Sequence, residues 1–233
     1  MDANKDKKSE IVLDEALNTS VSKAEQFFES YKKQIYMATI GILALAGLYA
    51  GYKQFIIKPQ EEEAQVAIFM AQKYFEQDSV DLALNGKEGQ FSGMLTIVDE
   101  YGSTKTGNLA KYYAGMCFLK KGEYQNAIDQ LESFSSNDDI IAPLAEGAIG
   151  DANVELANYD AALKHFIKAA QMSKNKFSAP LFYKKAGLVY EEMKEYSKAA
   201  EIYELIKKDY KESTEGQEMD KYIARAKTLA ENS

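Results

Sequence analysis

Apolar residues recur at intervals of three and four along most of the chain, the spacing that places them on one face of a helix. The pattern predicts helices at about 61–77, 78–84 and 91–101, with a turn-like segment at 85–89. We expect Pro59 to end the helix before it or to form a hinge. The first of these helices carries its apolar face on Ala64, Ala67, Ile68, Ala71 and Phe75. The chain is therefore expected to be all-α.

A glycine is followed nine residues later by a tyrosine, and then three residues later by an alanine, at three places in the chain. The glycines lie 35 and 37 positions apart, close to the period of about 34 of a stacking helix-turn-helix unit. A glycine inside a helix costs about 1 kcal/mol relative to alanine, so we expect each one to mark a close crossing of paired helices. The three sets are Gly115/Tyr124/Ala127, Gly150/Tyr159/Ala162 and Gly187/Tyr196/Ala199.

Large apolar residues, Leu131, Phe166 and Tyr203, follow the three alanines by four positions and are expected to form the buried stripe of each second helix. With small residues at the helix crossing and an aromatic after the turn, these units resemble tetratricopeptide repeats. The resemblance implies an α-solenoid that binds other proteins. The usual glycine of the inter-helix turn is kept only as Gly122, a departure that we expect to strain no essential step. The replacements are Ala157 and Lys194.

The repeat domain is placed at 59–233. It comprises a degenerate helical pair at 61–106, repeats at 108–141, 143–176 and 180–213, and a closing helix at 214–231. Thr214 and Gln217 are expected to form a capping box that opens the closing helix.

One apolar run lacks the helical alternation. Eighteen uncharged residues extend from Ile35 to Tyr52, and three further apolar residues follow Lys53. The run predicts a transmembrane anchor at 35–58, preceded by a tail at 1–34 with a short amphipathic helix. A cleaved signal peptide is the alternative, because Ala44 and Ala46 form a small-x-small site. About 34 residues precede the run, more than a signal peptide's short basic leader, which favours the anchor.

Lysine counts are equal on the two sides of the run, so the positive-inside rule gives little orientation, although Lys5, Lys7 and Lys8 favour a cytoplasmic tail. Inside the run, Gly47 and Gly51 form a Gly-x-x-x-Gly step. Such a step allows a second membrane helix to approach closely. Small residues are also common in membrane helices generally.

The charge balance of the repeat domain and the lack of catalytic motifs limit the classes of function to be expected. Residues 59–233 hold 20 basic and 29 acidic groups, a balance that disfavours nucleic acid as a partner. His165 and Cys117 are the only residues of their types, and neither belongs to a catalytic or metal-binding pattern. We therefore expect no enzyme activity, no cofactor, no metal and no small-molecule substrate.

The first helices of such repeats line a concave face, where we expect a mixed apolar and acidic groove. A groove of this kind suits a partner segment that is apolar and basic, although ordinary solvated surface is the alternative. It lacks the Lys, Asn and Arg cluster of repeats that bind the C-terminal carboxylate of cytosolic chaperones. The inward positions are Tyr112, Met116, Lys120, Asp151, Glu155, Lys184, Leu188 and Glu192, together with Gly147.

From about Phe27 to Ala230 the chain resembles the YfgM-like family of bacterial membrane-anchored tetratricopeptide proteins, with local likeness at 24–28 and 64–74. The resemblance implies an inner-membrane protein with a periplasmic repeat domain. It also implies an ancillary role at the Sec translocon, passing emerging polypeptides to envelope chaperones. A scaffold for envelope assembly or cell division is the alternative. No individual functional residue is transferred.

Overall fold

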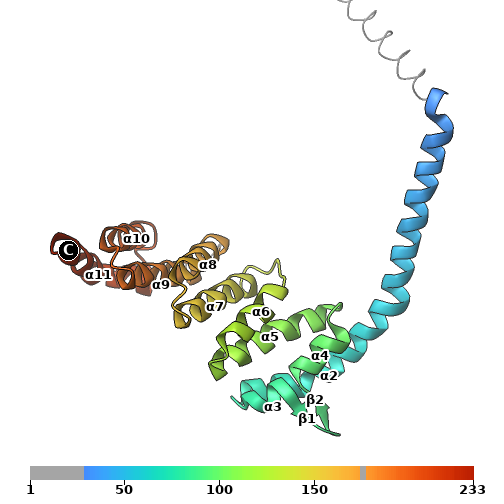
Figure 1. The fold of residues 1–233 in the computed structure, drawn as a ribbon, viewed down its shortest axis with the longest axis horizontal. Coiled ribbons are helices and arrows are strands. Elements are labelled where there is room, and N and C mark those ends of the chain that lie inside the picture. Colours follow the sequence, from blue (N-terminus) through green and yellow to red (C-terminus); the bar gives the residue numbers. More distant parts are fainter. Residues whose placement is uncertain (1–28, 174–176) are drawn as a thin grey trace, which may run out of the picture. The chain divides into compact units, whose positions relative to one another are not determined.

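The computed structural model describes residues 29–173 and 177–233 (Figure 1). The chain divides into two compact units, Met1–Ile56 and Ile57–Ser233. The amphipathic tail helix expected upstream of residue 29, and the local likeness at 24–28, lie outside the described residues. The same holds for the last three residues of the second repeat.

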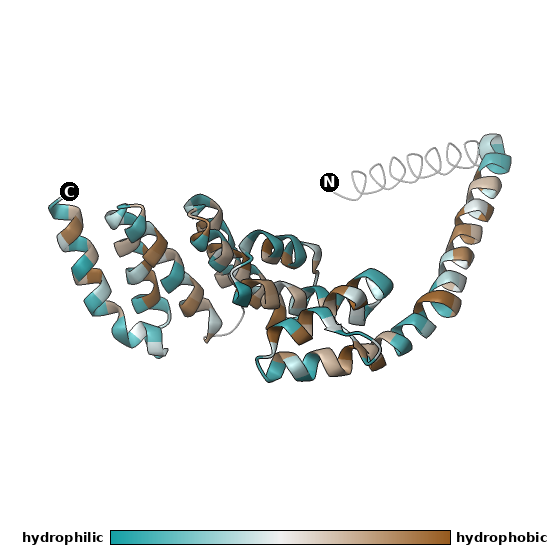
Figure 2. Cartoon of the chain, turned by 60° about the horizontal axis from the view of Figure 1, so that its bottom comes forward, coloured by the Kyte–Doolittle hydropathy of each residue, from teal (hydrophilic) through white to brown (hydrophobic). Residues whose placement is uncertain are grey.

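One helix, Glu29–Glu76, is long and apolar enough to cross a membrane by length and composition. Every residue from Ile35 to Tyr52 is helical, and the large apolar side chains from Tyr36 to Tyr52 are exposed. Pale and brown residues occupy most of this part of the helix in Figure 2. The expected long apolar helix is therefore present, while membrane insertion itself stays a prediction.

Pro59 does not end this helix, so the first of the two expectations from the sequence is wrong, while a hinge stays a prediction. A π-helical turn, Lys53–Ile57, leads directly into α2, Lys58–Glu76, and Pro59 lies in the first turn of α2. Proline lacks an amide donor and collides with the carbonyl four residues earlier in an ordinary helix. A wider turn immediately before the ring gives that carbonyl room. The interruption is a local widening rather than a break.

Three helix pairs and a closing helix follow in the part of the chain that the structure describes, and successive helices pack side by side (Figure 1). This arrangement confirms the expected all-α solenoid. The pairs are α5 (Lys105–Lys121) with α6 (Tyr124–Ser133), α7 (Ile141–Glu155) with α8 (Tyr159–Met172), and α9 (Ser178–Glu192) with α10 (Tyr196–Asp209); α11 (Thr214–Glu231) closes the stack.

The turn inside each pair has one geometry, in which a residue with left-handed backbone follows the first helix. Its amide and the next amide donate to two carbonyls at the helix end, as in a Schellman motif. Gly122 takes this position in the first pair with φ 75°, but Ala157 and Lys194 take it with φ 57° and 60°. A side chain with a β-carbon is disfavoured in this region, yet the same turn forms at both replacements, so the departure has a local backbone cost without breaking the helix pair.

The same turn identifies an earlier helix pair. Asp78 follows α2 with φ 58°, its amide donates to Phe75, and the amide of Ser79 donates to Tyr74. Counting from Asp78 places Ala71 where the other pairs have glycine and Ala83 where they have alanine. Both alanines are fully buried. The unit that begins with α2 therefore has the helix-turn-helix of the later pairs.

Its second helix is interrupted by a β-hairpin, which the sequence pattern did not predict. Helix α3 (Val80–Asn85) is followed by strands β1 (Gly86–Lys87) and β2 (Phe91–Ser92), and then by α4 (Met94–Tyr101). The chain returns beside the point where it left, since a β-carbon on Gly93 would lie 2.3 Å from the carbonyl carbon of Asn85. The expected single helix at 91–101 is thus shorter, and the unit is not a simple pair.

Omitting the hairpin, Gly86 to Ser92, aligns α3 and α4 with α10 as one continuous helix. Met94 then falls four positions after Ala83, where Tyr203 follows Ala199 in the last pair. Met94 and Ile97 are fully buried, as are Tyr203 and Ile206 at the matching positions. The degenerate first unit is therefore a helix pair whose second helix carries an inserted hairpin.

Two helix starts share one kind of cap, and for the closing helix the sequence pattern placed it one residue late. The hydroxyl of Ser213, not Thr214, accepts from the amide of Gly216 at 2.9 Å and donates to the carbonyl of Tyr210. Thr104 does the same at the start of α5, with Gly107 and Tyr101. The glycine is required because a β-carbon on Gly216 would lie 2.1 Å from the Tyr210 oxygen. This contact excludes the expected box of Thr214 and Gln217.

Candidate protein-binding surface

The expected groove residues lie on the first helices α5, α7 and α9, and most of them contact a neighbouring unit. Asp151 of α7 accepts from Lys185 of α9, with both carboxylate oxygens 2.7 Å from the ammonium nitrogen. Lys184 of α9 donates to Glu218 of α11 at 3.1 Å and lies 5.0 Å from the ring centre of Tyr222. These side chains form ion pairs that join α7 to α9 and α9 to α11. Their charges are therefore used within the solenoid.

A third ion pair continues this series. Arg225 of α11 donates to Glu191 of α9 at 2.6 Å. Burial, followed by the charge of Glu191, raises the pKa of the enclosed Tyr203 hydroxyl. The partners of each pair are 34 residues apart in the chain. Opposite charges at one repeat period were therefore a usable sequence signal, which the groove prediction did not use.

The expected residues of α5 are also engaged. Lys120 forms an ion pair of 2.6 Å with Asp78 and lies over the ring of Phe75, both in the preceding unit. Tyr112 packs on Phe134, with ring centres 5.5 Å apart. Burial raises the pKa of Tyr112. Both side chains of α5 are thus engaged, Lys120 with the preceding unit and Tyr112 with Phe134 of its own repeat.

The remaining expected residues divide into packed and exposed ones. Met116 packs on the core cluster of the first and second repeats. Glu155 accepts from the hydroxyl of Tyr124 at 3.2 Å but is otherwise exposed. Leu188 is 38% exposed and Glu192 is exposed on the same side of α9, one turn later. The surface available to a partner is therefore centred on Leu188 and Glu192, and its role in binding stays a prediction.

Gly147 belongs to the packing as well. A β-carbon on this residue would lie 2.1 Å from Cε1 of Phe182, so the glycine makes room for the next repeat's aromatic ring. It presents no functional group to a ligand.

His165 and Cys117, the two residues considered above as candidates for catalysis, both make structural contacts. Nδ1 of His165 lies 2.9 Å from Glu146, and the same carboxylate accepts from Lys168 at 2.5 Å. Cys117 is fully buried, and burial raises the pKa of its thiol to about 11. A buried, protonated thiol is a poor nucleophile. Both residues are therefore accounted for by packing.

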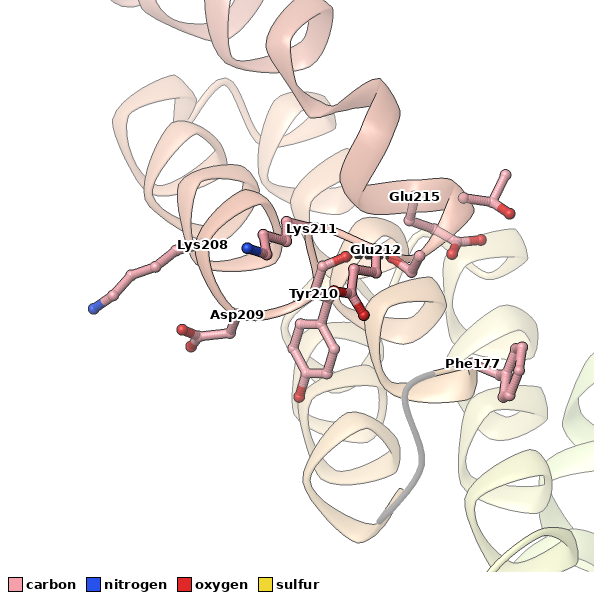
Figure 3. A pocket seen from close by; sticks show the side chains of 9 residues that line it. Phe177, Lys208, Asp209, Tyr210, Lys211, Glu212 and Glu215 are labelled. Carbon is pink, nitrogen blue, oxygen red and sulfur yellow. Dashed lines mark hydrogen bonds between the residues drawn. The ribbon is translucent and has the colours of Figure 1, made fainter.

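A hollow lies between the end of α10 and the start of α11 (Figure 3). Lys208 and Lys211 line it together with Asp209, Glu212 and Glu215. Charges of both signs surround the same space, so neither an anion nor a cation is selectively favoured. We assign no ligand to it.

Gly47 and Gly51, the expected helix-contact residues of the apolar run, lie with Ala44 and Leu48 along a shallow hollow of that helix. A β-carbon at either glycine would meet nothing within 4 Å. This geometry leaves room for another helix, and the contact itself stays a prediction.

A family model describes the repeats found above. Residues 109–138 and 185–213 match the model of the tetratricopeptide repeat. The chain carries tetratricopeptide repeats. The α7–α8 pair lies between these matches with the same turn and the same buried glycine crossing. No curated protein matches the chain in a search of curated sequences.

Solved structures show the same fold. The chain is similar to the nearly identical tetratricopeptide-like repeats of a putative kinesin light chain from Podospora anserina, at 12% identity and a TM-score of 0.51. A singly substituted form of that protein matches at 13% identity with the same TM-score. In both, the match covers 76% of this chain and 87% of that chain. At such identity the likeness establishes the solenoid fold alone.

Proposed function

We propose that this chain is a membrane-anchored adaptor that holds a protein partner through its tetratricopeptide repeats. One observation carries the proposal: a repeat solenoid closed by a capping helix lies in the same chain as a helix of Glu29–Glu76 with a membrane-length apolar run. Repeat solenoids present extended surfaces to other proteins. The tetratricopeptide matches support the protein-binding part of the proposal.

The finer proposal is an ancillary subunit of the Sec translocon. It places the tail in the cytoplasm, the anchor in a bacterial inner membrane and the repeats in the periplasm, where they would pass emerging polypeptides to an envelope chaperone. Its support is the resemblance to the YfgM-like family. The exposed Leu188 and Glu192 suit a partner segment that is both apolar and basic. No enzyme activity, cofactor or nucleic acid belongs to this proposal.

Co-purification tests the adaptor role. The full chain is extracted from native membranes in mild detergent, and its partners are identified by mass spectrometry. Recovery of translocon subunits or an envelope chaperone supports the finer proposal. Recovery of outer-membrane assembly or cell-division proteins instead supports the scaffold alternative. Recovery of no membrane or envelope protein contradicts both.

A matched pair of variants tests the binding surface. Leu188→Asp combined with Glu192→Lys reverses the chemistry at the exposed part of α9 and is expected to lose the recovered partner. Glu201→Lys, at an exposed position of α10, makes a similar charge change elsewhere and is expected to keep it. Equal recovery from both variants would remove this surface from the proposal.

Protease accessibility tests the orientation. External protease added to spheroplasts is expected to cleave a periplasmic repeat domain. Protection in intact spheroplasts, followed by cleavage after lysis, would place the repeats in the cytoplasm and overturn the translocon proposal.

A further inference from the structure

The first helix of the solenoid has an exposed apolar face where the later first helices are buried. In the later units, one apolar position of each first helix packs into the same core as the preceding second helix. The matching residue of α2 is Val66, which is 79% exposed, and Phe69, one turn further on, is 64% exposed. The buried residues at this position are Ala110, Ala145, Phe182 and Met219, exposed by 0, 4, 3 and 0%.

This face is built as one side of a helix-helix interface. In the third repeat the corresponding Phe182 lies against Gly147 of the preceding unit. In α2 no preceding unit within the described residues covers Val66 and Phe69. Exposure of two neighbouring large apolar side chains is unfavourable in water, and burying them against a second helix removes that cost.

The charges that flank the face specify the direction of a second copy. Glu62, Val66, Phe69 and Lys73 lie along one side of α2, at spacings of four, three and four residues. An antiparallel copy places Val66 opposite Phe69 and Glu62 opposite Lys73, and the two-fold symmetry repeats both contacts. A parallel copy in register places Glu62 opposite Glu62 and Lys73 opposite Lys73. Neither charge has an ion-pair partner among the described residues.

We propose that two copies of this chain associate through this face of α2, in an antiparallel and two-fold symmetric arrangement. The interface is isologous, since the same patch serves both copies. Val66 and Phe69 supply the apolar contact, while Glu62 and Lys73 select the antiparallel direction. The inference is independent of the partner surface on α9, so either can fail without the other. An antiparallel pair sets its two N-terminal ends apart, so two anchors reach one bilayer only if the chain bends at the π-helical turn, Lys53–Ile57.

Cysteine cross-linking tests the register. Val66→Cys and Phe69→Cys chains, carrying different tags, are co-expressed as full-length proteins and oxidised in their native membranes. The mixed pair is expected to form a disulfide-linked dimer in higher yield than either variant alone. Glu201→Cys, exposed on α10 and not on α2, is the control and is expected to cross-link weakly. The native Cys117 is fully buried and does not compete. Equal yields at all three positions would overturn the proposal.

Charge exchange tests the direction. The mass of the full chain is measured in detergent and in lipid nanodiscs over a range of concentrations. Glu62→Lys or Lys73→Glu alone is expected to weaken the dimer by about fivefold, as two exposed ion pairs become repulsive. The double variant is expected to recover the dimer. Val66→Glu with Phe69→Glu is expected to give a monomer with unchanged helix content.

Three results would overturn the proposal. The first is a monomeric wild-type chain in both detergent and nanodiscs. The second is a dimer that none of the α2 variants changes. The third is a dimer that only Gly47→Leu disrupts, since such a dimer is held by the apolar run rather than by α2.

Discussion

Gly150 and Phe166 meet where α7 crosses α8, so closely that a β-carbon on the glycine would lie 2.6 Å from Cε1 of the ring. The same relationship joins Gly187 to Tyr203, at 2.3 Å. Phe166 is 1% exposed and cannot move aside without disturbing its neighbours. The separation of these two helix pairs is therefore set by the lack of a side chain on the first helix.

Gly150→Ala is expected to destabilise the repeat domain by about 1–3 kcal/mol, because the added methyl group overpacks a closed crossing. Helix propensity alone would give the opposite sign. Thermal unfolding of the full chain in detergent, followed by circular dichroism, measures the effect. Combining Gly150→Ala with Phe166→Leu is the control, and it should recover part of the loss. A Gly150→Ala protein as stable as the wild type would contradict the crossing geometry.

Lys194→Gly is expected to stabilise the third repeat by about 1 kcal/mol, since glycine takes a left-handed backbone without the cost of a β-carbon. Lys194→Ala separates this effect from the loss of charge, as it keeps the β-carbon, and it should leave stability nearly unchanged. The same unfolding measurement distinguishes them. If both variants stabilise equally, the cause is the charge and not the backbone.

Gly93→Ala is expected to have opposite effects in two backgrounds. In the wild type the added β-carbon collides with the backbone at Asn85 and destabilises the first unit. In a variant that lacks Gly86 to Ser92, residue 93 lies inside a continuous helix, where alanine is favoured over glycine by about 1 kcal/mol. Thermal unfolding of the wild type, the deletion variant and the Gly93→Ala form of each measures the sign of the stability change in both backgrounds.

The deletion variant with Gly93 kept is the control for this comparison. It should fold with its helix content retained, because Met94 and Ile97 keep their buried positions. A deletion variant that fails to fold would show that the hairpin is integral to the first unit rather than inserted into it.

Some of these features were accessible from sequence and others were not. The spacing of Gly150, Tyr159 and Ala162 predicted a helix pair, since each position has a distinct steric role that recurs unchanged. The hairpin was missed because seven residues shift the register, so Met94 no longer falls four positions after Ala83. The groove prediction failed to anticipate contacts between neighbouring units. Helical period gives the direction of Asp151 but not the ion pair it forms with Lys185 across a unit boundary.

Glu146 is expected to make stability depend on acid pH. Burial raises its pKa, but hydrogen bonds from His165 and Lys168 outweigh this effect and leave the pKa below the usual 4.5. The carboxylate therefore stabilises the folded state above pH 4.5, and this contribution is lost as pH falls through the lowered pKa. Glu146→Gln should be less stable than the wild type at pH 6, and the difference should shrink towards pH 3. A difference that does not change with pH would contradict the ionised network.

Cys117 is expected to react with a thiol reagent only when the first repeat opens. Its side chain is fully buried and its pKa is raised to about 11 by burial, so the reactive thiolate is scarce at pH 8. Labelling followed by mass spectrometry should be slow in the native protein and complete in denaturant. Fast labelling of the native chain would show that the core around Cys117 opens readily.

The left-handed turn after α2 has a consequence for the length of the solenoid. Asp78, Gly122, Ala157 and Lys194 share one backbone conformation, and this conformation is kept even where the residue type disfavours it. Within the described residues, this conformation identifies four helical hairpins, because the turn at Asp78 adds one to the three that carry the glycine, tyrosine and alanine spacing. Matching by amino-acid profile recovers two of them. Within this chain, the backbone dihedral angles after each first helix are therefore more constant than the residue types found there.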